Sequence, residues 1–88
     1  MTREDDFLTR FDELPTGGYG GTAFGRRWRV TKSSMAGGRS QKLEAEELGG
    51  TGYVSMNLYR LADGTALLKH CEMPMEKVQE FLFAFEAD

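Results

Sequence analysis

Residues 24–42 read FGRRWRVTKSSMAGGRSQK, a stretch that holds six basic residues and no acidic one. Apolar and polar side chains alternate within it, so that Trp28 and Val30 face one way while Arg27, Arg29 and Thr31 face the other. This alternation predicts a half-buried antiparallel strand. The following SSMAGG, residues 33–38, predicts the turn that ends it.

Three more strands are predicted downstream, over residues 40–48, 53–61 and 65–71. The turns between them are marked by the glycine-rich residues 49–52 and by Asp63-Gly64, a compact hairpin signal. In the first two of these strands the period of two assigns one set of side chains to the core: Leu43, Ala45, Val54, Met56 and Leu58. The sequence therefore predicts a four-stranded antiparallel meander.

A helix is predicted at each end of this sheet. Residues 2–14 place Phe7, Phe11 and Leu14 on one face, and Pro15 ends the helix. After Pro74 an apolar stripe with i, i+3, i+4 and i+7 spacing indicates an amphipathic C-terminal helix; its members are Val78, Phe81, Leu82 and Phe85. We therefore expect an α+β fold of order α-ββββ-α, with both helices on one face of the sheet.

The 88 residues are expected to form one domain with a single core. We divide it into an N-terminal helix (1–14), a glycine-rich linker (15–23) and a ββββα unit (24–88). The linker contains TGGYGGT, and glycine is unfavourable inside packed elements because it loses the most backbone entropy on folding. A phosphate-binding loop is the alternative, although neither GxGxxG nor GxxxxGK[ST] fits the tract.

Composition limits the cellular context. A hydrophobic fraction of 40% and a net charge of -3 exclude disorder of the whole chain, and no apolar run reaches the roughly 18 residues that span a membrane. The first 14 residues carry five acids and do not resemble a signal peptide. The single cysteine, Cys71, indicates a reducing compartment. We expect a cytoplasmic protein without a membrane partner.

The face of the sheet that the helices leave open presents cations, aromatic rings and amides. That mixture is typical of single-stranded nucleic-acid binding, in which cations contact phosphates and rings stack on bases. The candidate residues are Arg27, Arg29, Lys32, Arg39, Lys42, Tyr53, Asn57 and Tyr59. Glu44 and Glu46 are predicted on the same face and would repel phosphate.

A protein-interaction or homodimerising module is the function we favour from the sequence, with nucleic-acid binding as the alternative. Phe83 falls off the apolar stripe of the last helix, so it is a candidate interface residue unless a wider core buries it. The basic stretch and the acidic remainder of the chain could also pair between two copies.

Catalytic arrangements are not evident. His70 and Cys71 are neighbours on a predicted strand, so their side chains would point to opposite faces. One His and one Cys do not make a zinc site, and Glu46 and Glu47 diverge in the same way. We expect no catalytic residues, no metal, no cofactor and no enzyme activity.

Two resemblances complete the sequence picture. The strand order, basic first hairpin and C-terminal helix over residues 24–85 resemble the positive-cofactor-four and Whirly single-stranded DNA-binding proteins, a family that implies homodimers binding DNA on their sheets. Residues 46–50 (EELGG), 55–61 (SMNLYRL) and 71–74 (CEMP) are similar to segments of small uncharacterised bacterial proteins. Some of those are labelled methionine sulfoxide reductases, but the Gly-Cys-Phe-Trp segment of that family is absent here.

Overall fold

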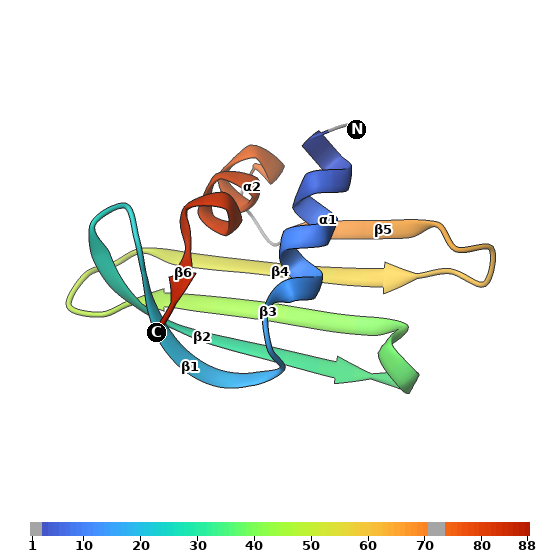
Figure 1. Cartoon of the computed structure of the whole chain (residues 1–88), viewed down its shortest axis with the longest axis horizontal. Coiled ribbons are helices and arrows are strands. Elements are labelled where there is room, and N and C mark those ends of the chain that lie inside the picture. The colour runs from blue at the N-terminus through green and yellow to red at the C-terminus, as the bar shows by residue number, and fades with distance from the viewer. Residues whose placement is uncertain (1–2, 71–73) are drawn as a thin grey trace.

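The computed structural model describes residues 3–70 and 74–88 and contains two helices packed on one antiparallel sheet (Figure 1). The elements, in chain order, are α1 (Arg3–Glu13), β1 (Gly17–Ala23), β2 (Arg26–Met35), the 3-10 turn η1 (Ala36–Gly38), β3 (Ser40–Glu47), β4 (Tyr53–Arg60), β5 (Ala66–His70), α2 (Met75–Ala84) and β6 (Glu86–Ala87). The predicted α+β class, the antiparallel sheet and the two helices are confirmed.

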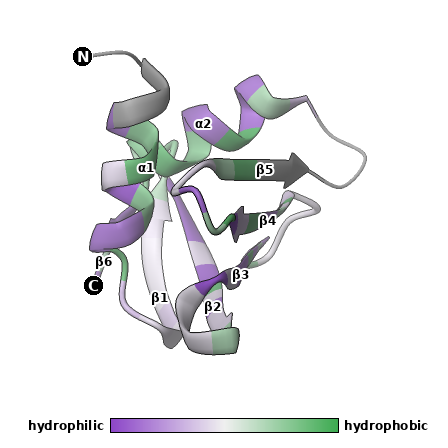
Figure 2. Cartoon of the chain, turned by 90° about the vertical axis from the view of Figure 1, so that its right-hand side faces the viewer, coloured by the Kyte–Doolittle hydropathy of each residue, from purple (hydrophilic) through white to green (hydrophobic). Residues whose placement is uncertain are grey.

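The sheet has the order β5-β4-β3-β2-β1-β6, and every neighbouring pair is antiparallel. The strands β1 to β5 therefore form a meander, and only β6 reaches its place by way of α2. Both helices lie over the same face of the sheet (Figure 2). The opposite face is left without a covering element among the described residues.

The core lies between the helices and that sheet face. Its fully buried side chains are the ones that the two periodicities predicted, including Phe7 and Phe11 of α1, Val30 of β2, and Phe81 of α2. The predicted inward residues of β3 and β4 are buried as well. Because strand period and helix period are both backbone properties, a sequence pattern that follows them identifies the core face directly.

The prediction of four strands and of a linker over residues 15–23 is wrong. The glycine-rich tract is strand β1, which pairs along its whole length with β2. Glycine is required here by tertiary packing: a Cβ on Gly21 would lie 2.4 Å from the Phe85 ring and 2.4 Å from the Glu86 carbonyl oxygen. The end of α2 and the start of β6 can therefore approach the strand only where it lacks side chains.

The end of β2 and the presence of β6 also differ from the prediction. Residues 33–35 extend β2, so that the turn is confined to Ala36–Gly38. The sixth strand, β6, pairs Ala87 with Gly21 and Glu86 with Thr22. A pairing of only two residues has no periodic sequence signal, and it forms because α2 directs the chain back along the edge of β1.

One arginine joins the helices at the end of α2. Arg10 donates through Nε to the Leu82 carbonyl oxygen at 3.1 Å and through Nη2 to the Phe85 carbonyl oxygen. The last carbonyls of a helix lack intrahelical partners, and a cation there also suits the helix dipole. Arg10 of α1 therefore orients α2 on the sheet.

Candidate functional site: an aromatic pocket beside α2

The open face of the sheet carries most of the predicted nucleic-acid-binding residues. Arg27 and Arg29 lie on β2, Lys42 on β3, and Tyr53, Asn57 and Tyr59 on β4, each alternating with core residues of the same strand. The sheet thus brings these six side chains to one face, as the alternation predicted.

Acidic residues of the same chain pair with much of this positive charge. Arg27 forms a bidentate pair with Asp88 at 2.7 and 2.5 Å, and Lys42 lies 2.8 Å from Glu44. The bond to Asp88 raises the pKa of Arg27, and the same bond lowers the pKa of the Asp88 carboxyl group. A phosphate would have to compete with these carboxylates.

Lys32 is not on the open face. Its side chain is buried, and Nζ donates to the carbonyl oxygens of Phe11 at 2.7 Å and Leu14 at 2.9 Å. Burial lowers the pKa of Lys32. Its assignment to a nucleic-acid site is therefore wrong: the period of two places residue 32 on the core side with Trp28 and Val30, where it satisfies the end of α1.

Arg39 and Arg29 are the remaining two basic residues of the predicted nucleic-acid site. Arg39 is exposed beyond the 3-10 turn and donates through Nε to the Ala36 carbonyl oxygen at 3.1 Å. Arg29 lines a hollow of about 180 Å³ with Thr31, Glu44 and Glu46, and no ion pair joins it to another residue of the described chain. Of the five cations predicted to bind nucleic acid, Arg29 and Arg39 are thus the two without a carboxylate partner or a buried role.

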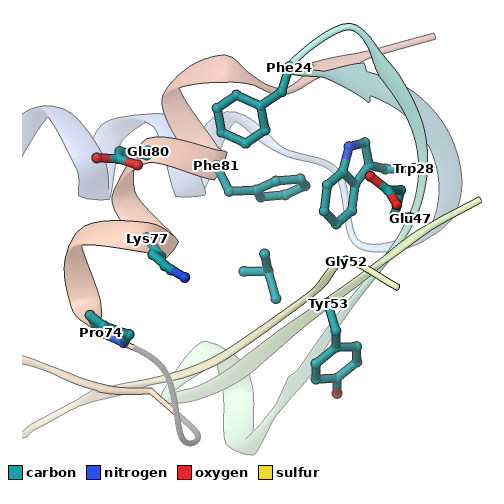
Figure 3. A pocket seen from close by; sticks show the side chains of 10 residues that line it. Phe24, Trp28, Glu47, Gly52, Tyr53, Pro74, Lys77, Glu80 and Phe81 are labelled. Atoms are coloured by element: carbon teal, nitrogen blue, oxygen red, sulfur yellow. The ribbon is translucent and has the colours of Figure 1, made fainter. Parts of the chain in front are cut away.

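A larger cavity lies at the other side of the molecule, between α2 and one end of the sheet (Figure 3). It measures about 490 Å³, and we call it the α2 pocket. The residues that line it come from the β1–β2 turn, three strands and α2: Phe24, Trp28, Glu47, Gly52, Tyr53, Val54, Pro74, Lys77, Glu80 and Phe81.

The inner wall of the α2 pocket is rigid and aromatic. The rings of Trp28 and Phe81 are edge-to-face with centroids 4.8 Å apart, and the Trp28 indole N–H donates to the Ala23 carbonyl oxygen at 3.1 Å. Gly52 lets the β3–β4 turn close on this wall, because a Cβ there would lie 2.7 Å from Cη2 of Trp28. The wall is therefore preorganised by core packing.

Phe24 forms the outer edge of the α2 pocket in an unusual backbone conformation. It occupies, with Gly25, the two-residue turn between β1 and β2, and the φ angles of the two residues are 56° and 73°. Turns of this kind favour Asn-Gly, because both residues need positive φ. Phe24 keeps this strained conformation while 59% of its surface is exposed. A large exposed ring held at a cavity by a strained turn is a candidate contact residue.

Sequence reasoning missed the α2 pocket. It identified Trp28 and Phe81 as core residues, which they are, but it did not bring them to one cavity with Phe24, Gly52 and Lys77. The available signal was Phe24-Gly25 between two strand patterns, where a turn that prefers Asn carries Phe instead. The linker predicted over residues 15–23 hides this signal, because Phe24-Gly25 is a hairpin turn only if a strand precedes it.

The predicted interface residue Phe83 is 41% exposed, and its ring lies edge-to-face with Phe7 of α1 at 6.5 Å. It is thus on the side of α2 that meets α1 and does not line the α2 pocket. Cys71 lies outside the described residues. Across residues 3–70 and 74–88, no three His, Cys, Asp or Glu side chains converge as a metal site would require.

Within the described ranges, neither helix is long and apolar enough to cross a membrane. Comparison with known proteins finds no family model, no curated protein and no solved structure that matches the chain. The two resemblances noted in the sequence therefore stay predictions.

Proposed function

We propose that this chain is a non-enzymatic protein-interaction module that binds its partner through the α2 pocket. One observation carries the proposal: the exposed Phe24 ring stands at the edge of an aromatic cavity although its backbone is left-handed. A bulky residue in that conformation costs on the order of 1–3 kcal/mol. Asn or Gly would remove the strain and would also remove the ring, so the ring has a use outside folding.

The volume and composition of the α2 pocket suit a ligand that presents a large apolar group. Its volume of about 490 Å³ lies within the usual range of roughly 300–1,000 Å³ for ligand sites. Phe24 at its border is exposed, and so is Leu48 at the same end of the sheet. Interfaces are enriched in aromatic residues, and the strongest contacts are side chains that fill such pockets.

The test uses a random peptide library selected on the intact chain. We expect the selected peptides to share an apolar anchor and to lose at least about tenfold in affinity to Phe24→Asn. Met35→Asn is the matched control, because Met35 is 63% exposed at the other end of β2. If the library yields no binder, or if both variants weaken binding equally, the proposal is wrong.

Two further outcomes would move the interface or identify the partner. Loss of binding in Phe83→Ala but not in Phe24→Asn places the interface on the α1 side of α2. A sedimentation mass of twice that of the chain, restored to the monomer mass by Phe24→Asn, identifies the partner as a second copy.

Single-stranded nucleic-acid binding is a second candidate, favoured by Arg29. This side chain is exposed on the open face, two strands from Tyr53, and pairs with no carboxylate within residues 3–70 and 74–88. Fluorescence anisotropy of a labelled oligonucleotide at increasing salt tests it. This candidate is supported if Arg29→Ala weakens binding and if Tyr59→Ala also weakens it, through the loss of stacking. Absence of binding at low salt contradicts it.

A further inference from the structure

The geometry points to an acidic peptide as the ligand of the α2 pocket: a segment whose apolar side chain enters the cavity while a neighbouring carboxylate pairs with Lys77. This inference rests on the proposed function and adds the chemistry of the partner. It depends on the three charged residues that line the pocket, Glu47, Lys77 and Glu80.

The two carboxylates contribute little negative charge to the interior. Glu47 accepts a hydrogen bond from Arg26 at 3.1 Å, and its side chain is only 9% exposed. That ion pair compensates its charge. Glu80 is exposed, and its carboxylate is directed away from the cavity (Figure 3).

Lys77 differs from Glu80 in its direction and from Glu47 in its lack of an ion pair within the described residues. Its side chain is exposed and extends toward the centre of the α2 pocket (Figure 3). No ion pair links it to any other residue in the described part of the chain. The pocket therefore presents one uncompensated ammonium group beside apolar rings, which favours a carboxylate and disfavours a second cation.

The shape of the surface favours a peptide over a small free acid. Phe24 is 59% exposed at the border, and Leu48 is exposed at the same end of the sheet. A small acid within the cavity would leave this apolar border in water. A peptide chain that continues from the anchor would cover it, and burial of apolar area is the main source of affinity.

The probes are three blocked pentapeptides that differ only beside the anchor: Gly-Glu-Phe-Glu-Gly, Gly-Gln-Phe-Gln-Gly and Gly-Lys-Phe-Lys-Gly. Binding is followed by amide chemical shifts in NMR and by the fluorescence of Trp28, the single tryptophan of the chain, which lies in the pocket wall. 3-Phenylpropionate provides the same ring and carboxylate without a peptide backbone.

We expect the Glu peptide to bind about tenfold more tightly than the Lys peptide at low salt, with the Gln peptide between them. Lys77→Gln should weaken the Glu peptide by about two- to fivefold, the range of an exposed ion pair, and should leave the Gln peptide unchanged. Lys42→Gln is the control, because it removes an equal charge from the opposite face of the sheet. It should change neither peptide.

The other outcomes separate the two proposals. If the three peptides bind equally and all depend on Phe24, the acidic preference is wrong and the proposed function stands. If none binds at millimolar concentration, the pocket does not accept an apolar anchor and both proposals are wrong. Tighter binding of 3-phenylpropionate than of the Glu peptide assigns the site to a small acid and overturns the choice of a peptide.

Discussion

Lys32 of β2 directs its ammonium group at the last turn of α1, where Nζ lies 2.7 Å from the carbonyl oxygen of Phe11. The same group lies 4.2 Å from the centroid of the Phe11 ring. Lys32, in the middle of the basic stretch, thus bonds the N-terminal helix to the sheet. The basic stretch therefore contains one buried cation, whereas its other basic residues are on the surface.

Replacing Lys32 should destabilise the protein. Lys32→Met keeps the apolar stem but leaves the carbonyl oxygens of Phe11 and Leu14 without this donor. We expect a loss of about 1–2 kcal/mol in the free energy of unfolding, measured by urea denaturation. Lys42→Met, on the open face, should stay within about 0.5 kcal/mol of the wild type. Equal effects of the two substitutions would contradict the buried role of Lys32.

The glycines of β1 should differ sharply in their tolerance of alanine. Gly21→Ala places a Cβ 2.4 Å from the Phe85 ring, and we expect a cost of about 1–3 kcal/mol from overpacking. Gly18→Ala meets nothing closer than 3.7 Å and has no positive φ, so it should be neutral or slightly stabilising. Thermal denaturation of both variants measures the difference. A tolerated Gly21→Ala would show that α2 does not pack against β1 as closely as described.

Phe24→Asn should raise stability while it weakens partner binding. Asn adopts a positive φ more easily than Phe and is favoured in an Asn-Gly turn, so we expect a gain of about 0.5–1 kcal/mol. Urea denaturation measures the gain. Opposite effects on stability and binding are typical of residues kept for function. A loss of stability in this variant would mean that the ring contributes more to folding through its contacts than its backbone costs.

The pH dependence of the pair between Arg27 and Asp88 follows from the direction of the shift. The hydrogen bond from Arg27 lowers the pKa of Asp88 below its ordinary value of 3.8. A carboxyl group with a lower pKa in the folded state stabilises that state above its ordinary pKa, and this contribution is lost as the pH falls through the folded value. Carboxyl-carbon NMR titration should give a midpoint below 3.8 for Asp88.

Arg27→Gln should return the Asp88 midpoint toward its ordinary value. Asp63 serves as the internal control, because its pKa is lowered mainly by the backbone N–H of Thr65 and should not change in this variant. An Asp88 midpoint that does not respond to Arg27→Gln would show that the pair does not persist in solution.

Elements with a periodic pattern of apolar residues could be predicted from the sequence. Alternation placed Val30, Leu43 and Met56 in the core, and helical spacing did the same for Phe81, because both periods are set by backbone geometry. Turn residues located the hairpins between the four predicted strands to within a few positions. These features depend on local spacing, so they can be read without knowing what packs against them.

The remaining features emerge only in the folded chain, because they depend on contacts between residues that are distant in the sequence. Glycine is needed at position 21 because Phe85 packs directly against that strand. Lys32 is buried because its ammonium group binds the carbonyl oxygens at the end of α1. Asp88, which follows β6, forms an ion pair with Arg27 of β2. The α2 pocket forms where Phe24, Gly52 and Lys77 meet, and proximity of that kind leaves no periodic pattern in a sequence.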